Sequence, residues 1–175
     1  INLAFLKFAF FDFYASNWHP LTWISHALDY ALWGLNPLGH HLTSIVLHAI
    51  NTFLVVVLIL RLQEAAKGEA PAQGERGMLI TAGVTGVLFG LHPVHVESVA
   101  WIAERKDLLC ALFFLLSIAR YARYAADMGS EATGGKMRSR FGSRDYLCCL
   151  GLFVLALMSK PMAVSLPVVL LILDW

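Results

Sequence analysis

The sequence predicts an all-α bundle of membrane-spanning helices, and three features support this fold class. Of the 175 residues, 58% are hydrophobic and 14% are charged, whereas soluble domains carry about 25% charged residues. Several apolar runs approach the ~20 residues that a helix needs to cross a bilayer. Polar stretches that contain glycine separate these runs. We therefore expect a polytopic membrane protein whose residues 1–175 form a single transmembrane domain, as part of a longer chain.

The expected elements alternate between spans and surface segments. About five spans are predicted, at 41–62, 78–91, 108–125, 146–158 and 162–174. Residues 1–40 and 92–107 are rich in Trp, His and Pro, and Trp favours the membrane–water boundary. We expect these two segments to lie along one surface, with an interfacial helix over 1–14 and a turn at Asn36–Gly39. The segments 63–77 and 126–145 are polar loops.

The distribution of Lys and Arg predicts the orientation. Positive residues concentrate in the cytoplasmic loops of membrane proteins. Nine of the 13 Lys and Arg lie in or beside the segments 63–77 and 126–145, and the remaining four are Lys7, Arg105, Lys106 and Lys160. Both polar loops are therefore predicted to be cytoplasmic, and the His- and Trp-rich segments to face outward. The three cysteines lie in apolar runs and are expected to be free thiols.

One stretch, LHPVHVESVAWIAERKD at Leu91–Asp107, concentrates ionisable groups between two apolar runs. Ionisable residues at membrane depth are costly and therefore mark functional sites. Pro93 should end the preceding helix at His92. We expect a short interfacial helix over Val94–Glu104, with Glu97, Trp101 and Glu104 near one face. Asp107 is expected to cap the next helix at its N-terminus.

Polar residues also recur along the first predicted span. His41, Ser44, His48 and Asn51 are spaced by three, four and three residues, which places them on one helical face. This stripe is expected to line a cavity open to the outer side, close to the HPVHVE segment. The alternative is that these side chains hydrogen-bond to neighbouring helices as packing contacts. In the second span, Gly86 and Gly90 should permit the close approach of another helix.

The polar residues of the stretch allow several chemistries. His92, His95 and Glu97 are ligands that suit zinc or copper, but the spacing is not HExxH and no metal is predicted. Glu97 and Asp107 are candidates for acid or base catalysis, or for ion pairs with Arg105 and Lys106. Glu97 should face inward and orient Arg105 or one of the two His.

Lys160 stands between two apolar runs and beside Pro161. A cation held there needs an anion, and a lipid phosphate is a natural one. The alternative is a lysine that reaches to the membrane surface and marks a helix end.

Three ordered motifs carry a resemblance to a known family. They are NWHPLTWISHALDYALWGLNPLGHHLTSIVLHAINT, LFGLHPVHVESVAWIAERKDLLCALFFLL and LMSKPMAVSLPVVLLILDW. Together they resemble bacterial relatives of the TMTC family, the transmembrane and tetratricopeptide-repeat O-mannosyltransferases with the GT-C glycosyltransferase fold. The resemblance implies an enzyme that transfers a mannose-like sugar from a polyprenyl-phosphate-linked donor to a protein hydroxyl. It also implies the bacterial inner membrane, with the site facing the periplasm.

The resemblance assigns roles to residues that match the family's motifs. Lys160 and Arg105 would bind the donor phosphate. Arg105 and Asp107 match one segment of the family, and Lys160 matches another. His92, Pro93, His95 and Glu97 match the HPxHxE segment, and His19 stands where the family has Arg. With the stripe residues, the predicted cavity on the acceptor side contains His19, His41, His48, His92 and His95. The family's acidic pair and its repeats would lie before Ile1 and after Trp175.

Two other functions remain open from the sequence. A transporter or flippase-like protein would use the His stripe as a substrate path, and its helices are often broken as at Ser159–Pro161. A membrane anchor for downstream repeats is the third possibility. The expected partners are the bilayer, a lipid-linked sugar and an acceptor protein or peptide, and no nucleic acid, since the net charge is +1. The identity of the sugar and of the acceptor, and any metal requirement, are not encoded in a recognisable pattern.

Overall fold

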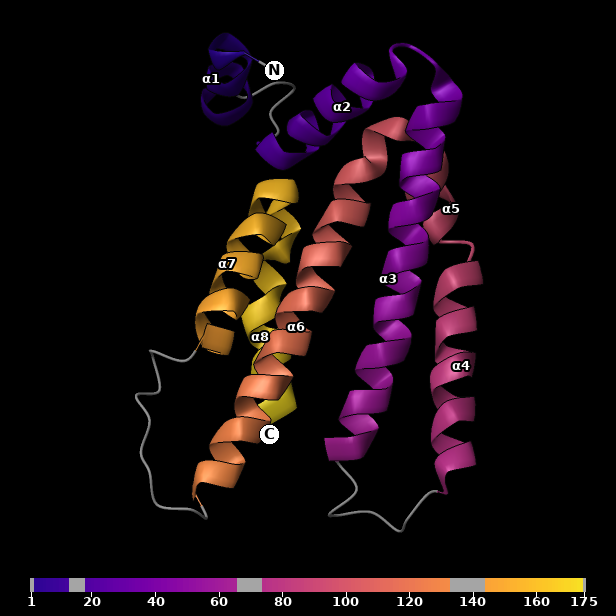
Figure 1. Cartoon of the computed structure of the whole chain (residues 1–175), viewed down its shortest axis with the longest axis vertical. Coiled ribbons are helices and arrows are strands. Elements are labelled where there is room, and N and C mark those ends of the chain that lie inside the picture. The colour runs from indigo at the N-terminus through magenta and orange to yellow at the C-terminus, as the bar shows by residue number, and fades with distance from the viewer. Residues whose placement is uncertain (1, 13–17, 66–73, 133–143, 175) are drawn as a thin grey trace.

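The computed structural model describes residues 2–12, 18–65, 74–132 and 144–174, with backbone only for 127–132 (Figure 1). The described residues fold into helices, as the sequence predicts. The α-helices are α1 (Leu3–Phe11), α2 (Pro20–Trp33), α3 (Pro37–Ala65), α4 (Glu75–Leu91), α5 (His95–Ala100), α6 (Arg105–Ala132), α7 (Arg144–Ser159) and α8 (Leu166–Asp174). Two 3₁₀ turns, η2 (Ile102–Glu104) and η3 (Pro161–Ser165), precede α6 and α8.

The long helices stand side by side, and the short ones gather at one end. Helix α3 packs against α4 and α6, and α6 packs against α7. Helices α1, α2 and α5 lie at the top in Figure 1, which we call the upper end. A small apolar core of Leu58, Ile118 and Leu166 joins α3, α6 and α8. The sequence segments predicted to share one surface, 1–40 and 92–107, do lie at the same end where the structure describes them.

The outer surface of the bundle is strongly apolar. On α4 alone, six large apolar side chains are exposed: Leu79, Ile80, Val84, Val87, Leu88 and Leu91. Soluble monomers rarely expose apolar patches of this extent. Two helices, Pro37–Ala65 and Ile102–Ala126, are long and apolar enough to cross a bilayer. A lipid environment explains both observations.

The five predicted spans all correspond to helices, but the structure supports two of them as candidate spans. The segments 41–62 and 108–125 lie within the two long helices. By contrast, α4 has 17 residues, α7 has 16 and α8 has nine. Each is shorter than the ~20 residues of a typical span. The structure thus shows two candidate spans and three shorter apolar helices.

Helix α3 begins earlier than the sequence predicted. The Asn36 side chain accepts a hydrogen bond from the Leu38 amide at 3.1 Å, and Pro37 occupies the first helical position, where its missing N–H costs nothing. The change of direction occurs just before, at Gly34, whose φ of 60° favours glycine. The predicted turn at Asn36–Gly39 is therefore the first turn of α3, which brings His40 into the helix.

The connection from α4 to α6 differs from the prediction in its second half. Helix α4 ends at Leu91 and His92 is extended, as Pro93 requires. The predicted helix Val94–Glu104 is wrong, because α5 stops at Ala100 and Trp101 has extended dihedrals of −91° and 116°. This break separates Glu97 from the face that Glu104 occupies. Glu97 is exposed, so the prediction that it faces inward is also wrong.

Gly86 shows the predicted close approach of α3 and α4. A Cβ at Gly86 would lie 2.4 Å from Val56 Cγ2, whereas a Cβ at Gly83 would meet no atom within 4 Å. Gly86→Leu should therefore lower the free energy of unfolding by about 1–3 kcal/mol, since the helices must separate. Thermal unfolding of the purified protein measures this effect. Gly83→Leu is the matched control on the same helix, and equal losses in both variants would contradict the packing.

Candidate functional site

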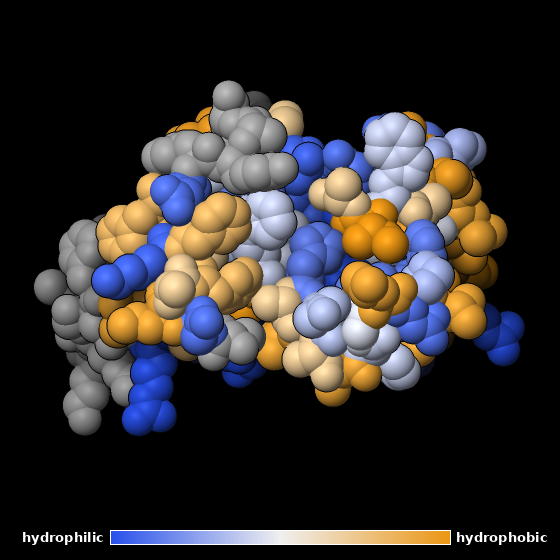
Figure 2. All heavy atoms as spheres, turned by 90° about the horizontal axis from the view of Figure 1, so that it is seen from above, coloured by the Kyte–Doolittle hydropathy of each residue, from blue (hydrophilic) through white to orange (hydrophobic). Residues whose placement is uncertain are grey.

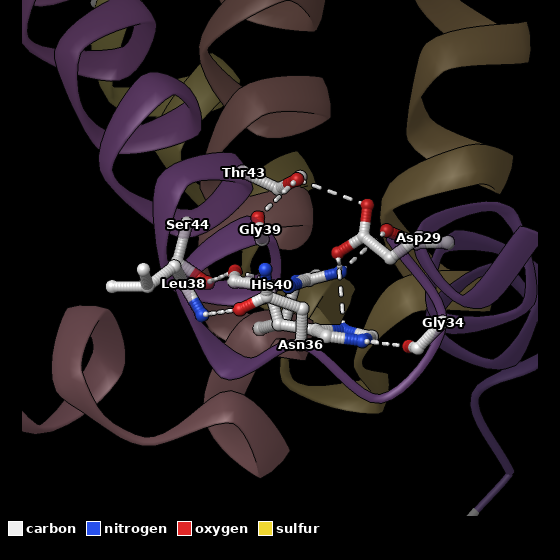
Figure 3. Close-up of polar contacts among 10 residues, drawn as sticks. Asp29, Gly34, Asn36, Leu38, Gly39, His40, Thr43 and Ser44 are labelled. Atoms are coloured by element: carbon white, nitrogen blue, oxygen red, sulfur yellow. Dashed lines mark hydrogen bonds and ion pairs between the residues drawn. The ribbon is translucent and has the colours of Figure 1, made fainter. Parts of the chain in front are cut away.

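A buried ion pair ties three helices together at the upper end (Figure 3). The side chain of Arg105 is completely buried, and its guanidinium donates to Asp29 and, at 2.6 Å, to the carbonyl of His40. Asp29 also accepts from Thr43 Oγ1 at 2.9 Å. The ring atom Nδ1 of His40 lies 3.4 Å from Asp29 Oδ2, without hydrogen-bond geometry. This network fixes α2, α3 and α6 to one another.

The network changes the role expected for Arg105. Sequence reasoning placed this residue at a donor phosphate, but its guanidinium has no exposed surface and is neutralised by Asp29. Asp29 was missed altogether. It shares a helical face with Thr22 and Ser25, and Ser25 Oγ lies 3.5 Å from Arg105. The helical spacing of these three polar residues in an aromatic-rich segment was the sequence signal that could have indicated Asp29.

Lys160 and Asp107 form a second, partly exposed ion pair at the same end. Lys160 Nζ lies 2.5 Å from Asp107 Oδ1, and the two side chains are 26% and 29% exposed. Ser98 Oγ donates to the other carboxylate oxygen at 3.4 Å. Asp107 lies in the first turn of α6 and does not cap the helix, contrary to the prediction. Its partner is Lys160, while Lys106 pairs with Glu104 at 3.0 Å.

Lys160 owes its position to the residues around it. It has extended dihedrals of −155° and 128° between α7 and η3, a conformation that the following Pro161 favours. The side chain therefore leaves the helical path and reaches across to α6. Because it remains partly exposed, Lys160 is a cation that an incoming anion can contact.

The polar stripe of α3 faces inward, as its spacing predicted. His48 Nε2 hydrogen-bonds the carbonyl of Gly90 at 3.0 Å, and its ring centroid lies 5.4 Å from that of His95. Asn51 donates to the carbonyl of Leu108 at 2.9 Å, and Ser44 is buried. These bonds match the alternative reading of the stripe as packing contacts. A role for His41 and His48 in a cavity stays a prediction.

The histidines of the HPVHVE segment lie close together but do not form a ligand set. The ring centroids of His92 and His95 are 6.3 Å apart. Burial lowers the pKa of His95, and the neighbouring His48 and His92 lower it further. Within the described ranges, no three His, Cys, Asp or Glu side chains are placed to hold a metal ion.

An open groove of about 680 Å³ lies between α2 and η2, and we call it the α2 groove. Figure 2 looks down on this end and shows polar side chains between apolar ones. The lining residues come from one face of α2, the turn into α3, and η2: His19, Thr22, Trp23, His26, Tyr30, Leu35, Pro37, His40, Ile102 and Ala103. Of the five histidines predicted for a cavity, His19 is the one found here.

Two imidazoles of the α2 groove, those of His19 and His26, have lowered pKa values. Burial, and then the positive charge of Arg105, lower the pKa of His26 to about 4. The pKa of His19 is also lowered, by burial and then by Lys106. His19 stacks on Trp23, with ring centroids 5.4 Å apart and an interplanar angle of 20°. The groove thus offers flat rings and uncharged hydrogen-bonding groups.

Comparison with known proteins relates this chain to one group of enzymes. The human Protein O-mannosyl-transferase TMTC4 is 38% identical over 120 residues, which cover 66% of the chain and 16% of that protein. Human TMTC1 is 30% identical over 158 residues, or 90% of the chain and 16% of that protein. Tmtc3 of Drosophila melanogaster is 36% identical over 65% of the chain and 13% of that protein.

The chain thus spans about a sixth of the length of the curated relatives it matches. No family model and no solved structure matches it. The similarity to human TMTC1 extends over 90% of the chain. The chain is therefore a homologue of part of the proteins named as TMTC protein O-mannosyl-transferases.

Proposed function

We propose that this chain forms part of a membrane glycosyltransferase that takes a mannose-like sugar from a polyprenyl-phosphate-linked donor. The acceptor is a protein hydroxyl. The observation that carries the proposal is the partly exposed Lys160–Asp107 pair at the upper end of a bundle whose outer surface is strongly apolar. The relatives' names supply the type of reaction, protein O-mannosyl transfer.

The chemistry explains why a fixed lysine is useful. The acceptor oxygen attacks the anomeric carbon of the sugar, and the bond from that carbon to the phosphate oxygen breaks. The electron pair stays on the lipid phosphate, so that negative charge grows there in the transition state. A cation at this oxygen stabilises the transition state more than the bound donor. Lys160 is placed for that role.

Asp107 is a positioning residue in this proposal. It holds the Lys160 ammonium at 2.5 Å and is itself held by Ser98. The donor phosphate would approach the exposed side of Lys160, while Asp107 keeps the ammonium from turning toward solvent. The proton of the acceptor hydroxyl passes to a general base, for which the family resemblance implies a carboxylate. Arg105 contributes by fixing α6, from which Asp107 projects.

We further propose that the upper end faces the outer side of the membrane. Arg61 lies near the C-terminal end of α3 and Arg76 near the N-terminal end of α4, and both of these helix ends are opposite the upper end in Figure 1. In the sequence, nine of the 13 Lys and Arg lie in or beside the segments 63–77 and 126–145, and this excess favours the cytoplasmic side for those segments. A donor on the outer leaflet would present its phosphate to Lys160.

Membrane vesicles of both orientations, containing the intact protein, test function and orientation together. Transfer to a membrane-impermeant Thr-containing peptide should occur from polyprenyl-phosphate mannose and only when the outer face is exposed. A nucleotide-linked mannose should not serve as the donor, because the phosphate contact and the lipid anchor are part of recognition. Transfer from the nucleotide sugar alone, or only on the cytoplasmic side, would contradict the proposal.

A further inference from the structure

We propose that the α2 groove binds an extended, uncharged segment of the acceptor polypeptide. This inference rests on the proposed function and adds a substrate class for one part of the site. The shape of the groove, its position beside Lys160 and its lack of charge all point to this occupant.

The length of the groove fits a short extended peptide. Its α2 wall runs from His19 to Tyr30, eleven positions that span about 16 Å at 1.5 Å per helical residue. An extended chain advances about 3.3 Å per residue, so the wall matches roughly five peptide residues. A single sugar ring would fill only part of it. The volume of about 680 Å³ lies within the range typical of ligand sites.

The groove begins next to the proposed donor phosphate site. Thr22, in its α2 wall, donates to the carbonyl of Ser159 at 3.4 Å, and Ser159 directly precedes Lys160. From there the groove leads along α2 to Leu35 and Pro37, which are exposed at the upper end. A peptide lying in it would extend from solvent to Thr22, whose hydrogen bond joins α2 to the residue that precedes Lys160. This geometry suits an acceptor hydroxyl near the Thr22 end.

The groove should reject charged side chains. None of its described lining residues is Asp, Glu, Lys or Arg. The nearby Arg105 and Asp29 neutralise each other beneath it, and the positive Arg105 opposes protonation of His26. A charged peptide side chain would lose water without gaining a partner. Trp23 and Tyr30 instead offer rings for apolar contact, and the imidazoles offer neutral hydrogen-bonding groups.

Fluorescent hexapeptides with a central Thr test the proposal on the intact protein without donor. One peptide has Ala and Val around the Thr, and a second has Lys at the flanking positions. Anisotropy should show tighter binding of the uncharged peptide. Tyr30→Ala should weaken that binding about tenfold through loss of the ring contact. Leu32→Ala, an exposed change on the same helix outside the groove, should leave it unchanged.

A negative charge introduced into the groove gives a second test, in which the expected result is a gain of binding. Leu35 is 87% exposed, so Leu35→Asp should fold normally. This variant should shift the preference toward the Lys-flanked peptide by about fivefold or more, through Coulomb attraction. Added salt should reduce the shift.

The outcomes separate the two proposals. Unchanged peptide binding in both Tyr30→Ala and Leu35→Asp would overturn the groove assignment. If these two variants bind peptide as the unchanged protein does but have a raised KM for the lipid-linked donor, the groove binds the donor, and its assignment to the acceptor peptide is overturned as well. Normal peptide binding by a protein that transfers no sugar from polyprenyl-phosphate mannose would contradict the proposed reaction and support the groove.

Discussion

Asp29→Ala is expected to lower the free energy of unfolding by about 3–5 kcal/mol, the range observed when one partner of a buried ion pair is removed. The reason is the complete burial of Arg105, whose guanidinium would lose its carboxylate partner while remaining out of water. The damage should be local to the upper end, where Arg105 also holds the carbonyl of His40. Thermal unfolding in detergent, monitored by circular dichroism, measures the loss.

The Lys106–Glu104 pair provides the matched control. Its two side chains are 23% and 22% exposed, so Glu104→Ala should cost less than about 1 kcal/mol. A double variant, Asp29→Leu with Arg105→Met, should recover most of the stability, because it removes both charges together. Equal losses for Asp29→Ala and Glu104→Ala would show that Arg105 is solvated and that the network does not hold the helices.

Local rules predicted the features that depend on neighbours in sequence. Pro93 ends α4 at Leu91, and Gly86 lets α3 approach α4, because each effect acts through the residue's own backbone. The inward stripe of Ser44, His48 and Asn51 followed from helical spacing alone. The helical nature of all five predicted spans followed from their apolar runs. These predictions needed no knowledge of the tertiary arrangement.

The pairing of charges could not be predicted in the same way. Arg105 and Asp29 are 76 residues apart, and Lys160 and Asp107 are 53 apart. The sequence suggested Arg105 and Lys106 as partners of Asp107, whereas the packing of α7 against α6 brings Lys160 to it. The break at Trp101 contains neither Pro nor Gly, so no local rule marked it. Glu97 was misplaced for that reason.

Predicting the α2 groove requires both the local sequence pattern and the tertiary packing. Its α2 wall repeats at helical spacing, from His19 through Trp23 and His26 to Tyr30, within a segment that the sequence predicted to lie along one surface because of its Trp, His and Pro. Its second wall comes from Ile102 and Ala103, which reach α2 only because η2 follows the break at Trp101. The sequence therefore indicated an aromatic surface, and the structure makes it a groove.

Lys160→Met is expected to reduce sugar transfer from the polyprenyl-phosphate donor by about 10²–10³-fold, the usual effect of removing one group that stabilises developing charge. The variant should insert and fold normally, because the Lys160–Asp107 pair is partly exposed and such pairs add less than about 1 kcal/mol to stability. Lys160→Arg should retain part of the activity, since the charge remains but its geometry changes.

Lys106→Met is the matched control for this experiment. Lys106 has similar exposure and also pairs with a carboxylate. Its partner, however, is Glu104 and not Asp107. Its loss should leave the rate of transfer within about twofold of the intact protein, as expected for an exposed pair. The kinetic signature distinguishes Lys160 further. A group that acts on the leaving phosphate lowers kcat and kcat/KM together, whereas a surface anchor changes neither. Transfer by Lys160→Met at the rate of the unchanged protein would make this lysine a marker of the helix end, and the donor phosphate would then have to bind elsewhere.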